Sequence, residues 1–258
     1  MTSLPMTSAR TEQAAHNNAR WCDTICRAHG SPGEFLDDLW LCRRATPRFY
    51  PNVVTLSRTR GSAAQLAHIQ ELMAAEIASG WAVKDSFCSL DLAPLAFQLL
   101  FEAAWIWRSP ALPAPDDALA GIRWASVRHP LELAAWETAW SGPPADDRSS
   151  GLPRIFLPAL LADDTIAFIA AYQGQQIIAG AILNRTESVV GLSNVFGPAD
   201  NAAQIWAGCV AAAIDAFPGL PLVGYEGGRD LAVAQALGFE VLEPLRVWSA
   251  RTRPPVRQ

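Results

Sequence analysis

The sequence predicts an α/β (α+β) protein in which a mixed β-sheet is flanked by helices, with an internal duplication. Two observations lead to this fold class. Residues 152–250 alternate between short apolar, β-prone segments and segments with helical spacing. A shorter version of the same order occurs in residues 53–107. The antiparallel meander and the strand–helix–strand units together predict a sheet of mixed strand direction.

The element order is clearest in residues 152–250. Three β-prone segments separated by short polar turns predict an antiparallel meander, and helices and strands then alternate. The strands are expected at 165–172, 176–183, 188–195, 220–226 and 239–248, the last one interrupted by Pro244. The helices are expected at 201–217, where Pro218-Gly219 ends the helical pattern, and at 229–237.

Three short matches in the same order, at nearly one offset, indicate the duplication. The matching pairs are Val53–Ser57 with Val189–Ser193, Ala63–Leu66 with Ala202–Ile205, and Leu99–Glu102 with Leu237–Glu240. In the first copy we expect strands at 53–56, 81–88 and 101–107 and helices at 62–79 and 94–100. Residues 1–48 are expected to form helices, so this copy would be truncated. The alternative is two unrelated α/β stretches in a chain rich in Ala and Leu.

Two proline-rich segments, 109–117 and 141–153, are expected to be linkers. Proline fixes φ and lacks a backbone N–H, so neither segment can lie inside a helix or a sheet. Together with the duplication, they predict two domains. Residues 1–118 would form an N-terminal half with extra helices, and residues 119–258 a C-terminal domain.

The overall composition excludes several classes of protein. The 258 residues are 50% hydrophobic and 17% charged, which is not the composition of a disordered chain. A net charge of −5 argues against a nucleic-acid partner. No run of about 20 apolar residues lacks charges or breakers, so no membrane association is expected. The sequence contains no Ser–His–acid arrangement, Walker loop or dinucleotide-binding glycine pattern.

The cysteines and the N-terminal residues predict a cytoplasmic location. Residues 1–20 lack the basic-then-apolar pattern of a signal peptide, and an odd number of cysteines, five, is typical of reduced thiols. His16, Cys22, Cys26 and His29 could in principle bind zinc. The simpler interpretation is an amphipathic helix on which Cys22 and Cys26 share one face, and no metal is expected. The sequence is also compatible with a homodimer.

The segment from Gly121 onward resembles the GNAT (GCN5-related N-acetyltransferase) fold of the acyl-CoA N-acyltransferase superfamily. Residues 121–129 would be its first strand and 130–141 its first helix, followed by the meander, the long helix and the next strand. Leu237-Gly238-Phe239 resembles the family's helix-to-strand junction. With the first block as a partial copy, the chain resembles a tandem GNAT protein. The resemblance implies acetyl-CoA or another acyl-CoA as co-substrate and an amine of a small molecule or peptide as acceptor.

In this family the pyrophosphate of the coenzyme binds at the turn before the long helix, where free N–H groups and the helix dipole favour an anion. The first copy fits the family's pattern of basic and small residues at this turn. The residues concerned are Arg58, Arg60, Gly61, Ser62 and Ala63. In the second copy the turn includes Val195 and Gly197, but Pro198 removes a donor and Asp200 adds a negative charge. The alternative for the first copy is an ordinary loop with Ser62 as the N-cap.

Three residues are candidate catalytic groups. The family often places a tyrosine in the short helix before the Leu-Gly-Phe junction, where this sequence has Ala234. Tyr225 could replace it as an acid, and Glu226 could act as a base, although both also suit a strand end and a turn. Asp85 interrupts an apolar strand, so it is either a site residue or a charge paired at a sheet edge. The sequence therefore suggests an acyltransferase or, alternatively, a catalytically degenerate binding or interaction protein.

Overall fold

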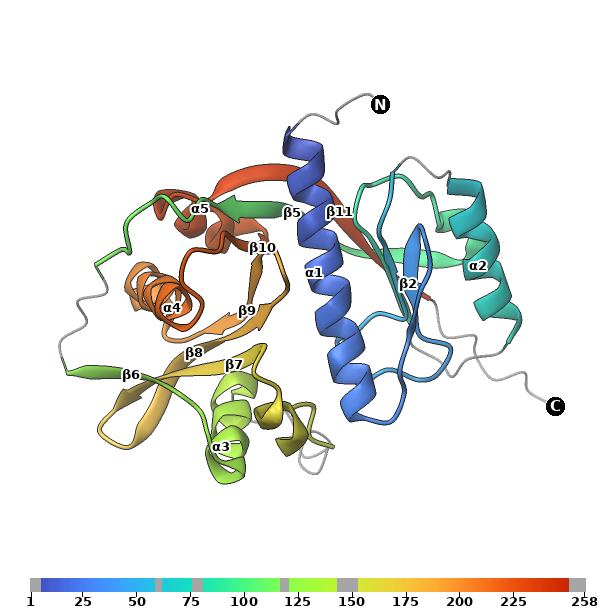
Figure 1. Cartoon of the computed structure of the whole chain (residues 1–258). Coiled ribbons are helices and arrows are strands. Elements are labelled where there is room, and N and C mark those ends of the chain that lie inside the picture. Colours follow the sequence, from blue (N-terminus) through green and yellow to red (C-terminus); the bar gives the residue numbers. More distant parts are fainter. Residues whose placement is uncertain (1–5, 59–61, 76–80, 117–120, 143–152, 251–258) are drawn as a thin grey trace. The chain divides into compact units, whose positions relative to one another are not determined.

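The computed structural model describes residues 6–58, 62–75, 81–116, 121–142 and 153–250 (Figure 1). Contacts divide the chain into two compact units. The first unit contains the described residues up to Trp105 and from Leu242 onward, and the second contains Ile106–Val241. Strands β5 (Phe97–Arg108) and β11 (Glu240–Ala250) therefore contribute residues to both units. The boundary expected near residue 118 separates the two copies of the repeated sequence, and it stays a proposal.

The first unit has a sheet between two helices. Its strand order is β1-β2-β3-β4-β11-β5, where β3 and β4 are parallel and the pairs β1–β2, β2–β3 and β4–β11 are antiparallel. The other elements are α1 (Met6–Ala28), β1 (Glu34–Phe35), β2 (Leu39–Leu41), β3 (Val53–Thr55), α2 (Ser62–Ala74) and β4 (Ala82–Asp85). Val53 packs in one core cluster with Ile69 of α2, and Val54 packs in another with Cys26 of α1. Because successive strand residues point to opposite faces, α1 and α2 cover opposite faces of the sheet.

Three expectations for the first unit are wrong. Residues 1–48 contain the helix α1, but also β1 and β2, which form a meander with β3. These strands are too short for a periodic pattern to identify them. The segment expected to be helical at 94–100 contains one 3₁₀ turn, Ala93–Leu95, which ends at Ala96 with φ of 62°, and β5 then begins. In β11, Pro244 does not interrupt the strand and is exposed.

The second unit has the strand order β10-β9-β8-β7-β6, in which only β9 and β10 are parallel. Its elements follow the predicted order closely, and α3 has the predicted bounds. They are β6 (Ile122–Ser126), α3 (Pro130–Ser141), the 3₁₀ turn Pro158–Ala162, β7 (Ile166–Gln173), β8 (Gln176–Arg185), β9 (Val190–Phe196), the 3₁₀ turn Ala199–Asn201, α4 (Ala202–Ala216), β10 (Leu222–Glu226) and α5 (Gly228–Ala236). The mixed sheet flanked by helices confirms the predicted fold class.

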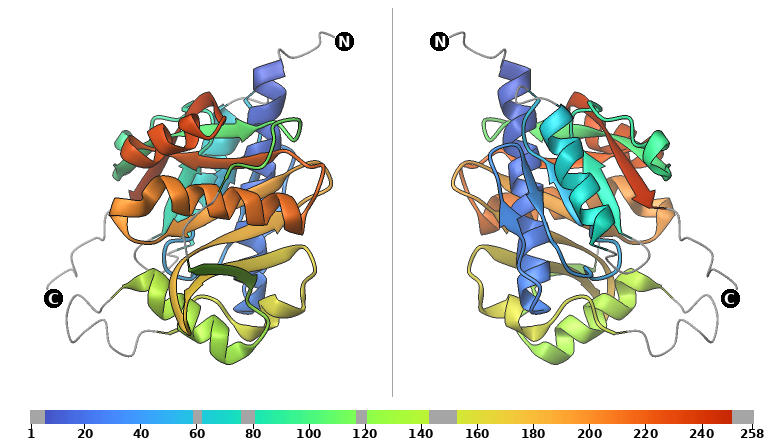
Figure 2. Two further views of the ribbon diagram at one scale, coloured as in Figure 1. Left: turned by 90° about the vertical axis from the view of Figure 1, so that its left-hand side faces the viewer. Right: turned by 90° about the vertical axis from the view of Figure 1, so that its right-hand side faces the viewer.

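Neighbouring residues of β8 show how α3 and α4 take opposite faces of this sheet (Figure 2). A Cβ atom on Gly180 would lie 2.6 Å from the Trp136 indole nitrogen of α3. The Cβ of the preceding residue, Ala179, lies on the other face, in the core cluster that contains Ile205 of α4. Gly208 of α4 is equally constrained, because its Cβ would lie 2.0 Å from the Trp124 ring. Small residues thus allow both helices to approach the sheet closely.

The register of the parallel strands supports the predicted duplication. Val54 of β3 pairs with Lys84, and Val190 of β9, its equivalent in the repeated sequence, pairs with Leu222. Lys84 and Leu222 are therefore equivalent positions of the two copies. Counting on from them, Asp85 corresponds to Val223, the second residue of β10, and Cys88 corresponds to Glu226, its last residue.

Candidate functional site

In the second unit, the paired part of β9 and β10 is shorter than either strand. Their register joins Val190 with Leu222 and Gly191 with Val223, after which β9 continues to Phe196 and β10 to Glu226. The β8–β9 register shifts by one residue within the same part of β9, where Asn194 has φ of 54°. A bulge of this kind bends a strand and exposes backbone hydrogen-bonding groups. The ends of the two strands therefore offer backbone groups to an extended ligand.

The turn between β9 and α4 requires a glycine. A Cβ atom on Gly197 would lie 2.5 Å from Ile205 Cδ1 and 2.8 Å from Ala179 Cβ. The turn continues through the 3₁₀ turn Ala199–Asn201 into α4, whose first N–H groups favour an anion. The Arg229 guanidinium, from the first turn of α5, donates a hydrogen bond of 2.8 Å to the carbonyl oxygen of Ala199. Gly197 and Arg229 fit an anionic group here, whereas the exposed carboxylate of Asp200 opposes one.

Tyr225 and Glu226 form the end of β10 and are both half-buried. Burial, together with the nearby charge of Asp230, raises the pKa of the Glu226 carboxyl to about 8. A carboxyl with a pKa near neutrality suits general acid–base catalysis better than an ordinary one. Ala234 of α5 is fully buried, so α5 presents no hydroxyl at the position where the family often has a tyrosine.

The predicted pyrophosphate turn of the first copy belongs to the first unit. Arg58 Nη2 lies 2.6 Å from Glu243 Oε2, and its guanidinium lies 5.7 Å from the Phe87 ring centre. Arg60 and Gly61 lie outside the described residues. Ser62 is the first residue of α2, and Ala63 is exposed. The pyrophosphate assignment for this turn therefore stays a prediction.

Asp85 of the first unit organises a turn. Its carboxylate is fully buried and accepts hydrogen bonds from the N–H groups of Leu90 (2.9 Å), Ser89 (3.1 Å) and Phe87 (3.4 Å) and from the Ser89 hydroxyl (3.3 Å). Burial raises the pKa of Asp85, and these hydrogen bonds oppose that rise. The carboxylate thus holds the chain that follows β4. The expected alternative, a charge paired at a sheet edge, does not describe it, because β4 lies between β3 and β11 and the partners of Asp85 are N–H and hydroxyl groups.

The strand ends of the first unit are joined by a side chain. The Thr55 hydroxyl of β3 accepts a hydrogen bond of 2.8 Å from the N–H of Ser86, and the Ser86 carbonyl accepts one of 2.9 Å from the Trp105 indole. Gly191 is the equivalent of Thr55 in the repeated sequence and has no side chain. A ligand that lies between the strands would thus have to displace the Thr55 side chain in the first unit. In the second unit, it would meet no corresponding side chain.

Replacing Asp85 with alanine is expected to lower the free energy of unfolding by about 2 kcal/mol, because buried N–H groups lose their acceptor. Urea unfolding followed by circular dichroism measures this change. Asp91→Ala is the matched control, since Asp91 is exposed and accepts a single hydrogen bond within the described residues, from the Ala93 N–H at 3.2 Å. Its effect should stay within about 0.5 kcal/mol. Equal effects of both substitutions would contradict the turn-organising role of Asp85.

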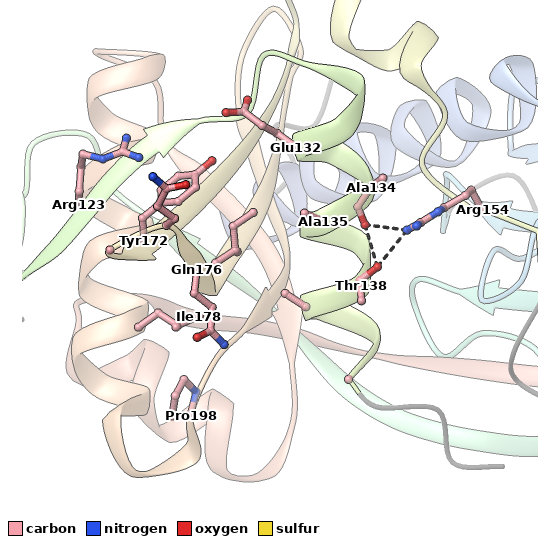
Figure 3. Close-up of a pocket in the computed structure, with 15 residues that line it drawn as sticks. Arg123, Glu132, Ala134, Ala135, Thr138, Arg154, Tyr172, Gln176, Ile178 and Pro198 are labelled. Carbon is pink, nitrogen blue, oxygen red and sulfur yellow. Dashed lines mark hydrogen bonds between the residues drawn. The ribbon is translucent and has the colours of Figure 1, made fainter. Parts of the chain in front are cut away.

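A pocket of about 1170 Å³ lies in the second unit between α3 and the β7–β8 hairpin (Figure 3). Small residues of α3, such as Ala135 and Ala139, form one side, and Gln176 and Ile178 of β8 form another. Pro198, from the turn before α4, lies at one end of the pocket. The pocket therefore adjoins the turn that precedes α4.

The remaining predicted features concern metals and membranes. Cys22 and Cys26 are buried in α1, and no three His, Cys, Asp or Glu side chains within the described ranges could hold a metal ion together. No helix in the described part of the chain is both long and apolar enough to cross a membrane.

The structure thus separates the predicted site residues into two groups. Tyr225, Glu226, Val195 and Gly197 belong to the second unit, and the described residues Arg58, Ser62, Ala63 and Asp85 belong to the first. Sequence reasoning missed the role of Arg229 beside the turn and of Asn194 in the bulge. Asn is one of the few non-glycine residues that adopts positive φ readily, which was the available signal at position 194.

No protein-family model and no curated protein matches the sequence. Solved structures do match. A GCN5-related N-acetyltransferase from Kribbella flavida is 14% identical, with a TM-score of 0.61 over 93% of this chain and 96% of that chain. One from Sphaerobacter thermophilus is 11% identical, with a TM-score of 0.53 over 96% and 95%. A tandem GNAT protein from the clavulanic acid biosynthesis pathway is 15% identical, with a TM-score of 0.52 over 84% and 79%. The chain therefore has the GNAT fold.

Proposed function

We propose that the protein is a cytoplasmic N-acyltransferase that moves an acetyl or other acyl group from acyl-CoA to the amine of a small molecule or peptide. The observation that supports this most directly is that β9 and β10 of the second unit continue beyond the residues that pair with each other, next to a half-buried carboxyl, Glu226. The backbone groups of Val195 and its neighbours would hold the extended arm of the acyl-CoA. Gly197, Arg229 and the start of α4 would hold its pyrophosphate.

In the proposed reaction, the acceptor nitrogen attacks the thioester carbonyl and the CoA thiolate leaves. The Glu226 carboxylate would accept a proton from the amine, directly or through water. The Tyr225 hydroxyl would give a proton to the leaving thiolate. Positioning of the two reactants would supply much of the rate acceleration.

Binding of acetyl-CoA is expected to raise the melting temperature, which differential scanning fluorimetry measures. At a ligand concentration a hundred times the dissociation constant, the added stability is about 2.7 kcal/mol. Arg229→Ala should reduce the shift, because Arg229 lies beside the proposed pyrophosphate turn. Arg58→Ala is the matched control from the first unit. If neither acetyl-CoA nor a longer acyl-CoA changes the melting temperature, the proposed function is wrong. If Arg58→Ala reduces the shift and Arg229→Ala does not, the coenzyme binds in the first unit.

A second candidate function is a catalytically degenerate GNAT-like protein that binds a ligand or partner. The negative charge of Asp200 in the turn and the alanine at position 234 favour it. This candidate predicts a thermal shift with acetyl-CoA but no release of CoA thiol in the presence of any amine. The acyltransferase predicts both.

A further inference from the structure

The pocket between α3 and the β7–β8 hairpin has two opposite charges that are not paired with each other. Arg123 lies on β6 and Glu132 in the first turn of α3, and both line the pocket. They lie on either side of the Tyr172 side chain at one end of the pocket (Figure 3). Within the part of the chain that the structure describes, no carboxylate forms an ion pair with Arg123 and no Lys or Arg side chain forms one with Glu132.

Arg123 is held in place by a cation–π contact and not by a carboxylate. Its guanidinium lies 4.2 Å from the centre of the Tyr172 ring, the residue that it faces across the β6–β7 pair. A guanidinium over an aromatic face can still donate hydrogen bonds at its edge, and its fork geometry matches a carboxylate. The other arginine of the pocket, Arg154, is engaged, because it donates to the Ala134 carbonyl at 2.7 Å and lies 3.8 Å from the Glu137 carboxylate. Arg123 is therefore the cation that the pocket offers to a ligand.

Glu132 offers the opposite charge. One of its carboxylate oxygens accepts a hydrogen bond of 3.1 Å from the backbone N–H of Arg128, which fixes the side chain at the start of α3. The buried Tyr172 between the two charges has a raised pKa, caused by burial and by the Glu132 charge, so its hydroxyl stays neutral and can hydrogen-bond a ligand. The pocket end thus combines a fixed cation, a fixed anion and a neutral hydroxyl.

We propose that this pocket binds a zwitterionic small molecule of the amino-acid type, with its carboxylate on Arg123 and its ammonium group on Glu132. A ligand with only one of these groups would leave the other protein charge uncompensated. Apart from Arg154, the rest of the pocket is formed by neutral residues such as Ala135, Gln176 and Ile178, which allow a side chain of varied chemistry.

The pocket also adjoins the proposed coenzyme turn, because Pro198 belongs to both. Pro198 lies at the opposite end of the pocket from Arg123 and Glu132 (Figure 3), so the ligand would suit the role of acceptor through an amine on its side chain, which deepens the proposed acyltransferase function. That role depends on the proposed function, whereas binding of the zwitterion does not.

Isothermal titration calorimetry with the whole protein tests the proposal. The probes are the standard amino acids, β-alanine and γ-aminobutyrate, and for each binder its amide, which lacks the carboxylate, and its N-acetyl derivative, which lacks the ammonium. At least one amino acid should bind, and both derivatives should bind about tenfold more weakly or worse. Arg123→Gln and Glu132→Gln should each weaken binding about tenfold or more, since each removes one charge-assisted contact. Arg128→Gln, an exposed arginine outside the pocket, is the control and should not change the affinity.

The calorimetry overturns the proposal if no amino acid binds, if the derivatives bind as well as the parent, or if binding survives both pocket substitutions. A comparison of CoA with 3′-dephospho-CoA adds a further test. If the 3′-phosphate strengthens binding in the wild type but not in Arg123→Gln, Arg123 serves the nucleotide and the zwitterion assignment is wrong. Amino-acid binding without any binding of acetyl-CoA would instead contradict the proposed function alone.

Discussion

Replacing Trp136 with alanine is expected to lower the free energy of unfolding by about 4 kcal/mol, a large effect for a single substitution. Trp136 is fully buried in α3, and its indole N–H donates a hydrogen bond of 2.8 Å to the Ile169 carbonyl of β7. Its ring packs edge-on against Phe168 at 5.3 Å and Phe196 at 5.1 Å. Alanine would leave a cavity and a buried carbonyl oxygen without its donor. Urea unfolding followed by circular dichroism measures the loss.

Two further substitutions test the contribution of the indole. Trp136→Phe keeps one six-membered ring but loses the pyrrole part of the indole and its donor, so it should cost about 2 kcal/mol, less than Trp136→Ala. Trp140→Ala removes a half-buried ring of the same helix face and should cost less than Trp136→Ala. Phe196 ends β9, so a loosened core should also weaken acetyl-CoA binding. An effect of Trp136→Ala below about 1 kcal/mol would show that α3 does not pack on the sheet through this residue.

Much of the second unit could be predicted because its elements are long enough for periodicity and turn residues to identify them. The helix Pro130–Ser141 and the hairpin of β7 and β8 are examples. The strands β1 and β2 were missed, since two or three residues contain no period. The helix expected at 94–100, which followed from the element order of the repeated sequence, was wrong. In the structure Leu99 and Leu100 belong to β5 and are exposed.

The candidate site was harder to predict because its properties depend on residues distant in sequence. Arg58 matched a phosphate-binding pattern, but its guanidinium pairs with Glu243, 185 residues away. Arg229 lies in the first turn of a short helix, α5, and only the fold brings it to the Ala199 carbonyl. Glu226 looked like an exposed turn residue beside two glycines. Its raised pKa is produced by burial, which no local pattern reports.

Replacing Glu226 with glutamine is expected to reduce the rate of CoA release from acetyl-CoA in the presence of an amine by about 10²–10⁴-fold, the usual contribution of a general base. The amide keeps the size of the side chain but cannot accept the proton. Binding of acetyl-CoA should persist, because Glu226 is not assigned to the coenzyme. A thiol-release assay gives the rate, and calorimetry gives the affinity for acetyl-CoA.

The pH dependence provides the more specific test of the same residue. A base with a pKa of about 8 is mostly protonated at neutral pH, so wild-type activity should rise as the pH increases through 8. Asp230→Asn, the matched control, removes the charge that helps to raise this pKa and should move the rise to lower pH. Glu226→Gln should abolish it.

The stability of the folded protein should change with pH in the opposite direction to the activity. The carboxyl binds its proton more tightly in the folded state, because its folded pKa of about 8 exceeds the ordinary value of 4.5. The folded protein therefore loses stability as the pH rises through this interval, and Glu226→Gln does not. The melting temperature of Glu226→Gln relative to wild type should accordingly increase from pH 5 to pH 8.5. If the difference is constant while activity is lost, Glu226 titrates normally and its catalytic role cannot rest on a raised pKa.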